Sequence, residues 1–166
     1  VFRKSNLLTE IDAINKAVLN TKIDIKVQMR EEVITNDLNT FELEFPCKIM
    51  DPDDEFHRVT TDAFEFNGLV CTVKNRLRSN QLAIMDLDGN IILDNVGSYN
   101  PDTGLVSFIG FEPVRLLSGD TFIRIQVSPQ DDSSIQPLRN MILKLETDRS
   151  STTAVIDRQT ETLKVT

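Results

Sequence analysis

The spacing of hydrophobic residues along the chain changes near residue 20. Before that point hydrophobic residues recur every three or four positions, which predicts an amphipathic helix that ends near Asn20. From Ile23 to Met29 they recur at every second position, which is typical of a strand with one buried face. The chain therefore predicts one helix followed by β-structure. The helical stripe consists of Leu7, Ile11, Ile14 and Val18.

Short segments with the two-residue period continue after residue 35, and turn residues separate them. Residues 41–49 predict a strand, and Pro46 indicates that this strand either lies at a sheet edge or ends in an irregularity, because proline cannot donate a backbone hydrogen bond. Residues 64–73 predict a hairpin that turns at Asn67-Gly68, since this pair readily adopts positive φ. Two more turns are predicted, at residues 88–90 and 100–104.

The C-terminal third is less regular. Residues 122–127 predict a further strand, whereas residues 138–145 fit either a strand or a short helix. Residues 152–156 are a candidate last strand. We therefore predict an α+β fold that is predominantly antiparallel β, with an N-terminal helix followed by a β-rich domain built from hairpins. The predicted units are a helix plus strand over 1–35, the β-rich domain over 36–147 and a C-terminal segment, a short strand or tail, over 148–166.

Composition narrows the classes of function. The chain has 166 residues, of which 40% are hydrophobic, enough for the core of one domain. Its apolar runs are too short to span a membrane, and no signal peptide is apparent. A net charge of −8 repels phosphate backbones, so we expect no nucleic-acid partner and no membrane partner. Val1 opens the chain in place of methionine, which indicates a processed product or a fragment of a longer protein, and we favour the fragment.

Residue types that commonly carry catalysis are sparse. His57 is the one histidine, and no nucleophile motif accompanies it, so a structural role is favoured. Cys47 and Cys71 fall on separate predicted strands, which indicates two reduced core thiols rather than a disulfide framework. We predict no catalytic residue, no enzyme activity and no small-molecule substrate.

Two acidic segments contain several oxygen ligands that a metal ion could use. In Asp86–Asn90, the glycine lies at the fourth position rather than the sixth that a calcium-binding EF-hand loop requires, which favours a hairpin turn. The acidic patch Asp51–Glu55 offers oxygen ligands but is typical of a solvated loop. Glu42 and Glu44 fall on one strand face, unlike the opposed carboxylates of a glycosidase. We therefore predict neither a metal site nor a cofactor.

The apolar run from Phe108 to Leu117 has two interpretations. The favoured one is a strand buried on both faces. The other is a subunit interface, because apolar patches that contact a neighbour have the same composition as core. The candidate interface residues are Phe111, Val114, Leu116 and Leu117.

Several segments resemble one family. Residues 61–82, which run from Thr61 through Phe64-Glu65-Phe66-Asn67-Gly68 to Leu82, resemble a stretch of the T4-like phage baseplate wedge protein, the large wedge subunit related to the baseplate J family. Residues 100–111 and 137–143 resemble later stretches of the same region. Residues 7–33 resemble the helix-then-strand unit before it. The resemblance covers most of the chain but includes no catalytic signature.

The resemblance implies a structural virion protein, the C-terminal part of a contractile-tail baseplate wedge subunit. Such subunits associate with themselves, as a homodimer or ring, and with other baseplate wedge proteins. The expected location is the tail baseplate of the virion, assembled in the host cytoplasm. Two alternatives stay open: a β-sandwich module of a larger surface protein that binds a ligand or calcium, and a hydrolase that uses an acidic pair.

Overall fold

The computed structural model describes residues 4–14 and 24–131. These residues form one short helix and ten strands, which confirms the predicted class of a mostly antiparallel β-protein with an N-terminal helix. The elements are α1 (Lys4–Ile14), β1 (Val27–Glu32), β2 (Asn39–Glu44), β3 (Val59–Thr61), β4 (Phe64–Phe66), β5 (Leu69–Asn75), β6 (Gln81–Asp86), β7 (Ile91–Tyr99), β8 (Leu105–Phe111), β9 (Arg115–Leu116) and β10 (Phe122–Val127).

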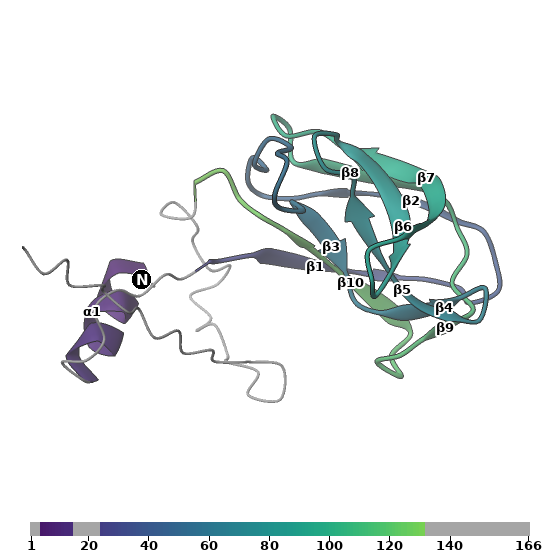
Figure 1. Cartoon of the computed structure of the whole chain (residues 1–166), viewed down its shortest axis with the longest axis horizontal. Helices are drawn as coiled ribbons and strands as arrows, with labels where there is room; N and C mark the ends of the chain where they lie inside the picture. Colours follow the sequence, from purple (N-terminus) through teal and green to yellow (C-terminus); the bar gives the residue numbers. More distant parts are fainter. Residues whose placement is uncertain (1–3, 15–23, 132–166) are drawn as a thin grey trace, which may run out of the picture. The chain divides into compact units, whose positions relative to one another are not determined.

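All ten strands belong to one barrel-like antiparallel sheet (Figure 1). Its order is β1-β10-β3-β5-β6-β7-β8-β2, and β4 pairs with both β5 and β9 beside this path. The first strand and the last strand of the described domain are therefore neighbours, and they pair from Val27↔Val127 to Glu32↔Phe122. Strand β2 lies at the other end of the order, and it ends at Glu44, before Pro46, whereas the prediction continued to residue 49.

Alternation along the strands separates an inner face from an outer face. In β5, Cys71 and Val73 are buried while Thr72 and Lys74 point outward. Aromatic rings fill one part of the core: Phe41 stacks on Phe108 with ring centroids 4.7 Å apart. Phe111 meets both Phe64 and Phe108 edge to face, which is a favourable arrangement for ring quadrupoles.

The predicted turns are confirmed. The β4–β5 hairpin turns through Asn67 and Gly68 with φ of 51° and 75°, the double positive φ of a tight primed turn. The β6–β7 hairpin turns at Asp86–Asn90, where the Asp86 carbonyl accepts the N–H of Gly89. Between β7 and β8 the turn closes with Gly104 at φ 75°, a region that favours glycine.

The N-terminal predictions need adjustment. Helix α1 is described from Lys4 to Ile14; the rest of the predicted helix, from residue 15 to Asn20 and including Val18, lies outside the described residues. Strand β1 starts at Val27 rather than Ile23. Because β1 pairs with β10, the boundary predicted at residue 35 does not separate this strand from the β-rich sheet. No helix within the described ranges has the length and apolar character to span a membrane.

The favoured interpretation of the run from Phe108 to Leu117 is wrong. Strand β8 buries one face only, with Phe108 fully buried and Ile109 65% exposed. Pro113 follows Glu112 after the strand, and the chain then forms the two-residue strand β9. The apolar residues on the outside of this run are therefore surface residues. The predicted segments at 138–145 and 152–156 lie outside the described residues.

The chain enters and leaves the barrel-like sheet at one end, and several turns lie at the other end. The chain enters β1 after Lys26 and leaves β10 after Val127, and these two points lie together because the strands are antiparallel neighbours (Figure 1). We call this the attachment end. The opposite end, which we call the far end, holds the β1–β2 turn, the β4–β5 and β6–β7 hairpin turns and the segment from β8 to β10.

Candidate functional site

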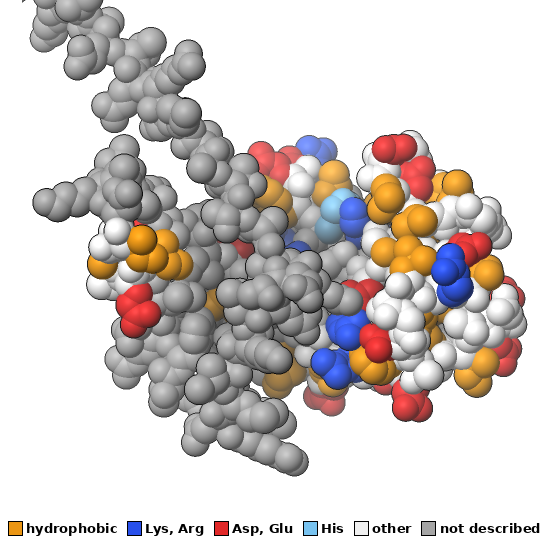
Figure 2. All heavy atoms as spheres, turned by 90° about the horizontal axis from the view of Figure 1, so that it is seen from below, with side chains coloured by type: hydrophobic (Ala, Val, Ile, Leu, Met, Phe, Trp, Pro, Cys, Tyr) orange, Lys and Arg blue, Asp and Glu red, His pale blue; other side chains and the backbone are white. Residues whose placement is uncertain are grey.

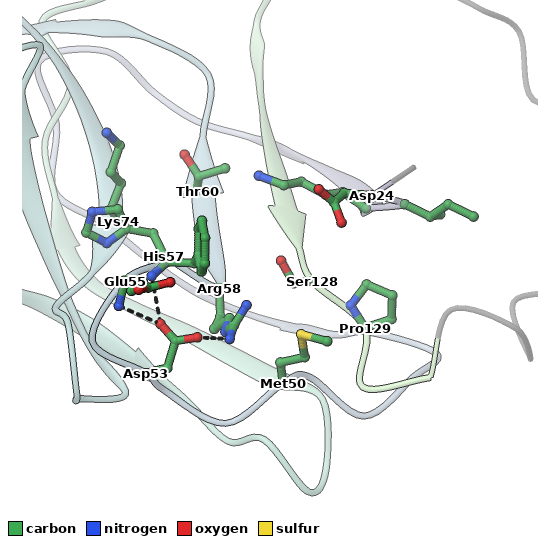
Figure 3. Close-up of a pocket in the computed structure, with 13 residues that line it drawn as sticks. Asp24, Met50, Asp53, Glu55, His57, Arg58, Thr60, Lys74, Ser128 and Pro129 are labelled. Carbon is green, nitrogen blue, oxygen red and sulfur yellow. Dashed lines mark hydrogen bonds and ion pairs between the residues drawn. The ribbon is translucent and has the colours of Figure 1, made fainter. Parts of the chain in front are cut away.

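A hollow of about 730 Å³ opens at the attachment end. Four parts of the chain line it: the entry to β1, the loop before β3, the outward side chains of β3 and β5, and the exit of β10 (Figure 3). Its volume lies in the range of small-ligand sites. Polar and apolar side chains both line it, and they are Asp24, Ile25, Lys26, Met50, Asp53, Glu55, Phe56, His57, Arg58, Thr60, Lys74, Ser128 and Pro129.

One buried amide fixes the wall of this hollow. The side chain of Asn75 is fully buried at the end of β5, and its Oδ1 accepts the backbone N–H groups of Arg58 and Val59 at 2.6 and 3.0 Å. Its Nδ2 donates to the carbonyls of Arg76 and Ser79 at 3.0 and 3.1 Å. This amide therefore satisfies four backbone groups and ties the segment before β3 to the turn after β5.

His57 lies on the same wall. Its Nδ1 is 2.6 Å from the Asn75 carbonyl oxygen, a contact in which the ring N–H donates. His57 and Lys74 are both among the side chains that line the hollow (Figure 3). The bond to Asn75 fixes the orientation of the ring, and it supports the structural role predicted for His57.

An ion pair between Asp53 and Arg58 stabilises the loop before β3. Arg58 Nη2 donates to Asp53 Oδ2, and the other Asp53 oxygen accepts the N–H groups of Glu55 and Phe56 (Figure 3). The backbone hydrogen bond from Phe56 is the main reason why the pKa of Asp53 is lowered, with Glu55 and the Arg58 charge adding to it. The acidic patch Asp51–Glu55 thus includes an ordered turn around Asp53.

Tyr99 connects the core to the loop before β3 through a hydrogen bond to Met50. Its ring is buried, and its hydroxyl donates to the Met50 carbonyl at 3.2 Å. Burial disfavours the phenolate and raises the pKa of Tyr99 to about 12. Met50 itself lines the hollow, so this hydrogen bond connects the core to the site.

The raised pKa of Tyr99 predicts a loss of stability at alkaline pH. A tyrosine titrates near pH 10 in the unfolded chain, so the contribution of the neutral phenol is complete below about pH 10 and is lost as the pH rises toward about 12. Urea unfolding at about pH 8 and about pH 11 should show this loss in the wild type. Tyr99→Phe should show a smaller loss between the same two pH values; equal losses would contradict the prediction.

The outer face of four neighbouring strands carries six basic side chains, and carboxylates such as Asp24, Glu32 and Glu55 lie among them. Each basic residue alternates with inward-facing neighbours in or directly beside β1, β10, β3 or β5; Arg124, for example, lies between buried Ile123 and Ile125. We call this surface the basic face. It consists of Lys26, Arg30, Arg58, Lys74, Arg76 and Arg124.

Half of the basic face is neutralised by carboxylates. Arg58 pairs with Asp53, and Arg76 Nη1 lies 3.0 Å from Asp94 Oδ1. Arg124 is buried and binds both Asp62 and Asp120 at 2.8 Å. Within residues 4–14 and 24–131, no carboxylate pairs with the remaining three cations, although the Arg30 guanidinium lies over the Phe122 ring. These three are Lys26, Arg30 and Lys74.

The far half of the sheet carries most of the exposed apolar side chains. Fourteen large hydrophobic side chains are exposed among the described residues, and ten of them lie in this half. Figure 2 shows hydrophobic side chains exposed at several places on the right-hand part of the domain. The ten are Ile34, Leu38, Leu69, Val70, Leu87, Ile91, Leu93, Ile109, Val114 and Leu117.

The structure divides the four predicted interface residues into two pairs. Phe111 and Leu116 are buried in the core of this chain, at 0% and 7% exposure, so they are not available to a neighbour. Val114 and Leu117 are 40% and 41% exposed on either side of β9. The interface prediction therefore narrows to the second pair.

The remaining acidic candidates do not gather into a site. The Asp86 carboxylate accepts the N–H of Asp88 and two N–H groups of Asn90, as a hairpin turn requires. Glu42 and Glu44 lie exposed along β2, and Glu42 accepts a hydrogen bond from Ser107. Over the described ranges, no group of three or more His, Cys, Asp or Glu residues is placed to hold a metal ion.

Both cysteines are free thiols, as predicted. Cys71 is fully buried in β5, and Cys47 is half-buried after β2. Burial raises the pKa of both thiols, and the nearby charge of Asp86 adds to the shift at Cys71. A raised pKa lowers the thiolate fraction, which makes these thiols poor nucleophiles.

Comparison with protein-family models, curated proteins and solved structures gives no match to this chain. The resemblance to a baseplate wedge subunit therefore rests on the sequence segments quoted above. The sequence did not predict the hollow, the four hydrogen bonds of the Asn75 side chain or the basic face. The alternating basic residues Lys26 and Arg30 were visible in the sequence, but the strand order that places them near Lys74 was not.

Proposed function

We propose that this chain is a structural, non-enzymatic part of a contractile-tail baseplate wedge subunit, and that its far end packs against neighbouring subunits. The resemblance of residues 61–82 to the wedge protein supplies the class of function. The observation that supports the proposal is the distribution of exposed apolar side chains. The chain enters and leaves the sheet at the attachment end, whereas ten exposed hydrophobic side chains lie in the opposite half.

This arrangement suits a domain that projects from a larger assembly. Large contiguous apolar patches on a folded surface commonly mark sites where another subunit binds. At the far end, Val114 extends the ladder that joins β4 and β9, because its N–H donates to the Glu65 carbonyl at 2.8 Å. The adjacent Arg115–Glu65 ion pair supplies a polar rim of the kind that surrounds the apolar centre of an interface.

Self-association tests this proposal. The mass of the full chain, measured by light scattering across a wide concentration range, should rise above that of the monomer. Leu117→Lys should shift this equilibrium toward the monomer by about tenfold in Kd, because a lysine charge would be desolvated in the interface. Leu77→Lys is the matched control, since Leu77 has 45% exposure against 41% for Leu117 and lies toward the attachment end.

The outcomes separate clearly. An unchanged mass for Leu77→Lys together with a reduced mass for Leu117→Lys supports packing through the far end. A wild-type chain that stays monomeric at every concentration contradicts self-association. Equal effects of the two substitutions would show that association does not use the far end. Melting temperatures of both variants confirm that each remains folded.

A further inference from the structure

The strand order leaves two open edges in the barrel-like sheet, one at β1 and one at β2. Each of these strands has a hydrogen-bonded neighbour on one side only, and no pairing joins the two within the described residues. An open edge presents unpaired N–H and C=O groups to other chains, so proteins commonly protect it with a bulge, a proline or charged side chains. The two edges differ in how far they are protected.

The β2 edge is protected. Its register on β8 shifts between Asn39 and Phe41, an irregularity that interrupts the ladder. Pro46 follows two residues after the strand and has no N–H to donate. The exposed side chains of Glu42 and Glu44 carry charges of one sign, so a second copy of this edge would be repelled.

The β1 edge has neither a bulge nor a proline. All six residues of the strand pair with β10 in one continuous register. In the ranges that the structure describes, no backbone hydrogen bond reaches the other side of β1. Strand β1 is therefore a regular edge to which another strand can be added.

Backbone direction decides which residues of β1 would bond to an added strand. Val33 continues the strand, and its N–H donates to the Thr121 carbonyl at 3.2 Å. Because backbone groups alternate in direction along a strand, odd-numbered residues bond toward β10 and even-numbered residues face the open edge. The even-numbered residues from Lys26 to Glu32 therefore offer their N–H and C=O groups, and their side chains are exposed.

The charges along this edge are complementary to those of a second copy. In an antiparallel pair of β1 strands centred on Met29, Lys26 of one copy faces Glu32 of the other. Gln28 then faces Arg30, and two-fold symmetry produces each contact twice. A shift of one copy by two residues brings either Arg30 against Arg30 or Lys26 against Arg30, so like charges disfavour the neighbouring registers.

The geometry points to β1 as the site where a second copy of this chain adds its own β1, so that the two sheets become continuous. This inference goes beyond the proposed function, because it concerns a different surface and requires neither the far end nor a baseplate. A partner strand with charges of one sign fits this edge less well, since Arg30 and Glu32 would attract and repel it in turn.

Disulfide cross-linking of the full chain tests the register. Met29 would lie on the two-fold axis, where facing residues have Cα atoms about 4.5 Å apart, a separation that a disulfide can span. Met29→Cys, oxidised with glutathione disulfide, should give a covalent dimer on a non-reducing gel. The wild type contains the free thiols Cys47 and Cys71, and it should remain without a cross-link under the same conditions.

Val27→Cys is the matched control for the cross-link. Val27 is half-buried on the same strand and the same side as Met29. In the proposed register it faces Glu31, so the two copies of residue 27 would be separated by four residues along the strand, or about 14 Å. This variant should give no more dimer than the wild type. Equal cross-linking in the two cysteine variants, or none through residue 29, would overturn the proposed pair.

Charge reversal separates the two ion pairs from an effect of net charge. Lys26→Glu and Glu32→Lys should each raise the dimer Kd about tenfold, because each variant brings like charges face to face twice. Lys26→Glu/Glu32→Lys should restore the original Kd. Analytical ultracentrifugation measures these values in a Leu117→Lys background, which weakens the far-end contact. If Glu32→Lys strengthened association instead, net charge would control it and the pairing would be refuted.

The two self-contacts are distinguishable. Met29→Cys/Leu117→Lys should cross-link as Met29→Cys does. If the far-end contact is wrong, Leu117→Lys leaves the light-scattering mass unchanged while the cross-link still forms. If the β1 contact is wrong, the cross-link is absent while Leu117→Lys still lowers the mass. Saturable binding of a labelled, alternating Lys-Val hexapeptide without a cross-link through residue 29 would replace the second copy with a basic partner strand.

Discussion

Gly97→Ala should remove a large part of the free energy that stabilises the fold. Gly97 pairs with Leu82 and with Phe108 in the centre of the sheet, and its φ of 143° is a conformation that L side chains rarely adopt. A Cβ at this position would overlap the Ser107 carbonyl oxygen, and it would lie only 3.0 Å from Phe108 Cα. Backbone atoms of a paired strand cannot move aside without separating β7 from β8.

The expected loss combines two costs, each of about 1–3 kcal/mol: overpacking in the interior and a strained backbone conformation. Their sum is a large part of the 5–15 kcal/mol that stabilises a typical domain. Urea unfolding followed by circular dichroism measures it. Gly89→Ala is the matched control, because Gly89 also has a positive φ but no atom within 4 Å of an added Cβ. It should cost only about 1–2 kcal/mol, and equal losses in the two variants would contradict the steric argument.

Asn75→Leu should have the second-largest effect. The substitution keeps a similar volume but leaves the N–H groups of Arg58 and Val59 and the carbonyls of Arg76 and Ser79 without their side-chain partner. Each buried group left unsatisfied costs about 1–3 kcal/mol, and water from the hollow can reach some of them. We therefore expect a loss of about 4 kcal/mol in the free energy of unfolding.

Asn80→Leu is a suitable control for this prediction. Asn80 is exposed in the turn between β5 and β6, and its backbone carbonyl rather than its side chain accepts the N–H of Tyr99. A surface change of this kind should stay within about 0.5 kcal/mol. Asn75→Leu should also alter the His57 NMR signals, since the segment before β3 loses its anchor. If the Asn75→Leu and Asn80→Leu variants were equally stable, the Asn75 side-chain amide would not contribute to stability as predicted.

Local sequence signals predicted most of the β-structure. Asn67-Gly68 and the turn ending at Gly104 were predictable because their backbone conformations require particular residues. Strand β10 was predicted with its observed bounds, since Ile123, Ile125 and Val127 alternate with longer polar side chains. These are properties of a few consecutive residues, so they need no knowledge of the partner strands.

The errors came from features that depend on distant residues. Whether Ile109 faces a core or solvent depends on what covers the outer face of β8, and the local alternation does not contain that information. The same holds for Asn75, which in the sequence is one of many asparagines. Its importance arises from the approach of residues 58 and 59 to the end of β5, a contact between segments about 16 residues apart.

The pairing of the first and last strands sets how this domain would respond to a pulling force. Tension along the chain would act on Lys26 and Ser128, which flank the same end of the β1–β10 pair. The load then reaches the Val27↔Val127 pair first and the other pairs in succession, instead of being shared by the whole ladder. We expect the domain to open like a zipper from its attachment end at low force, while the far end stays folded until last.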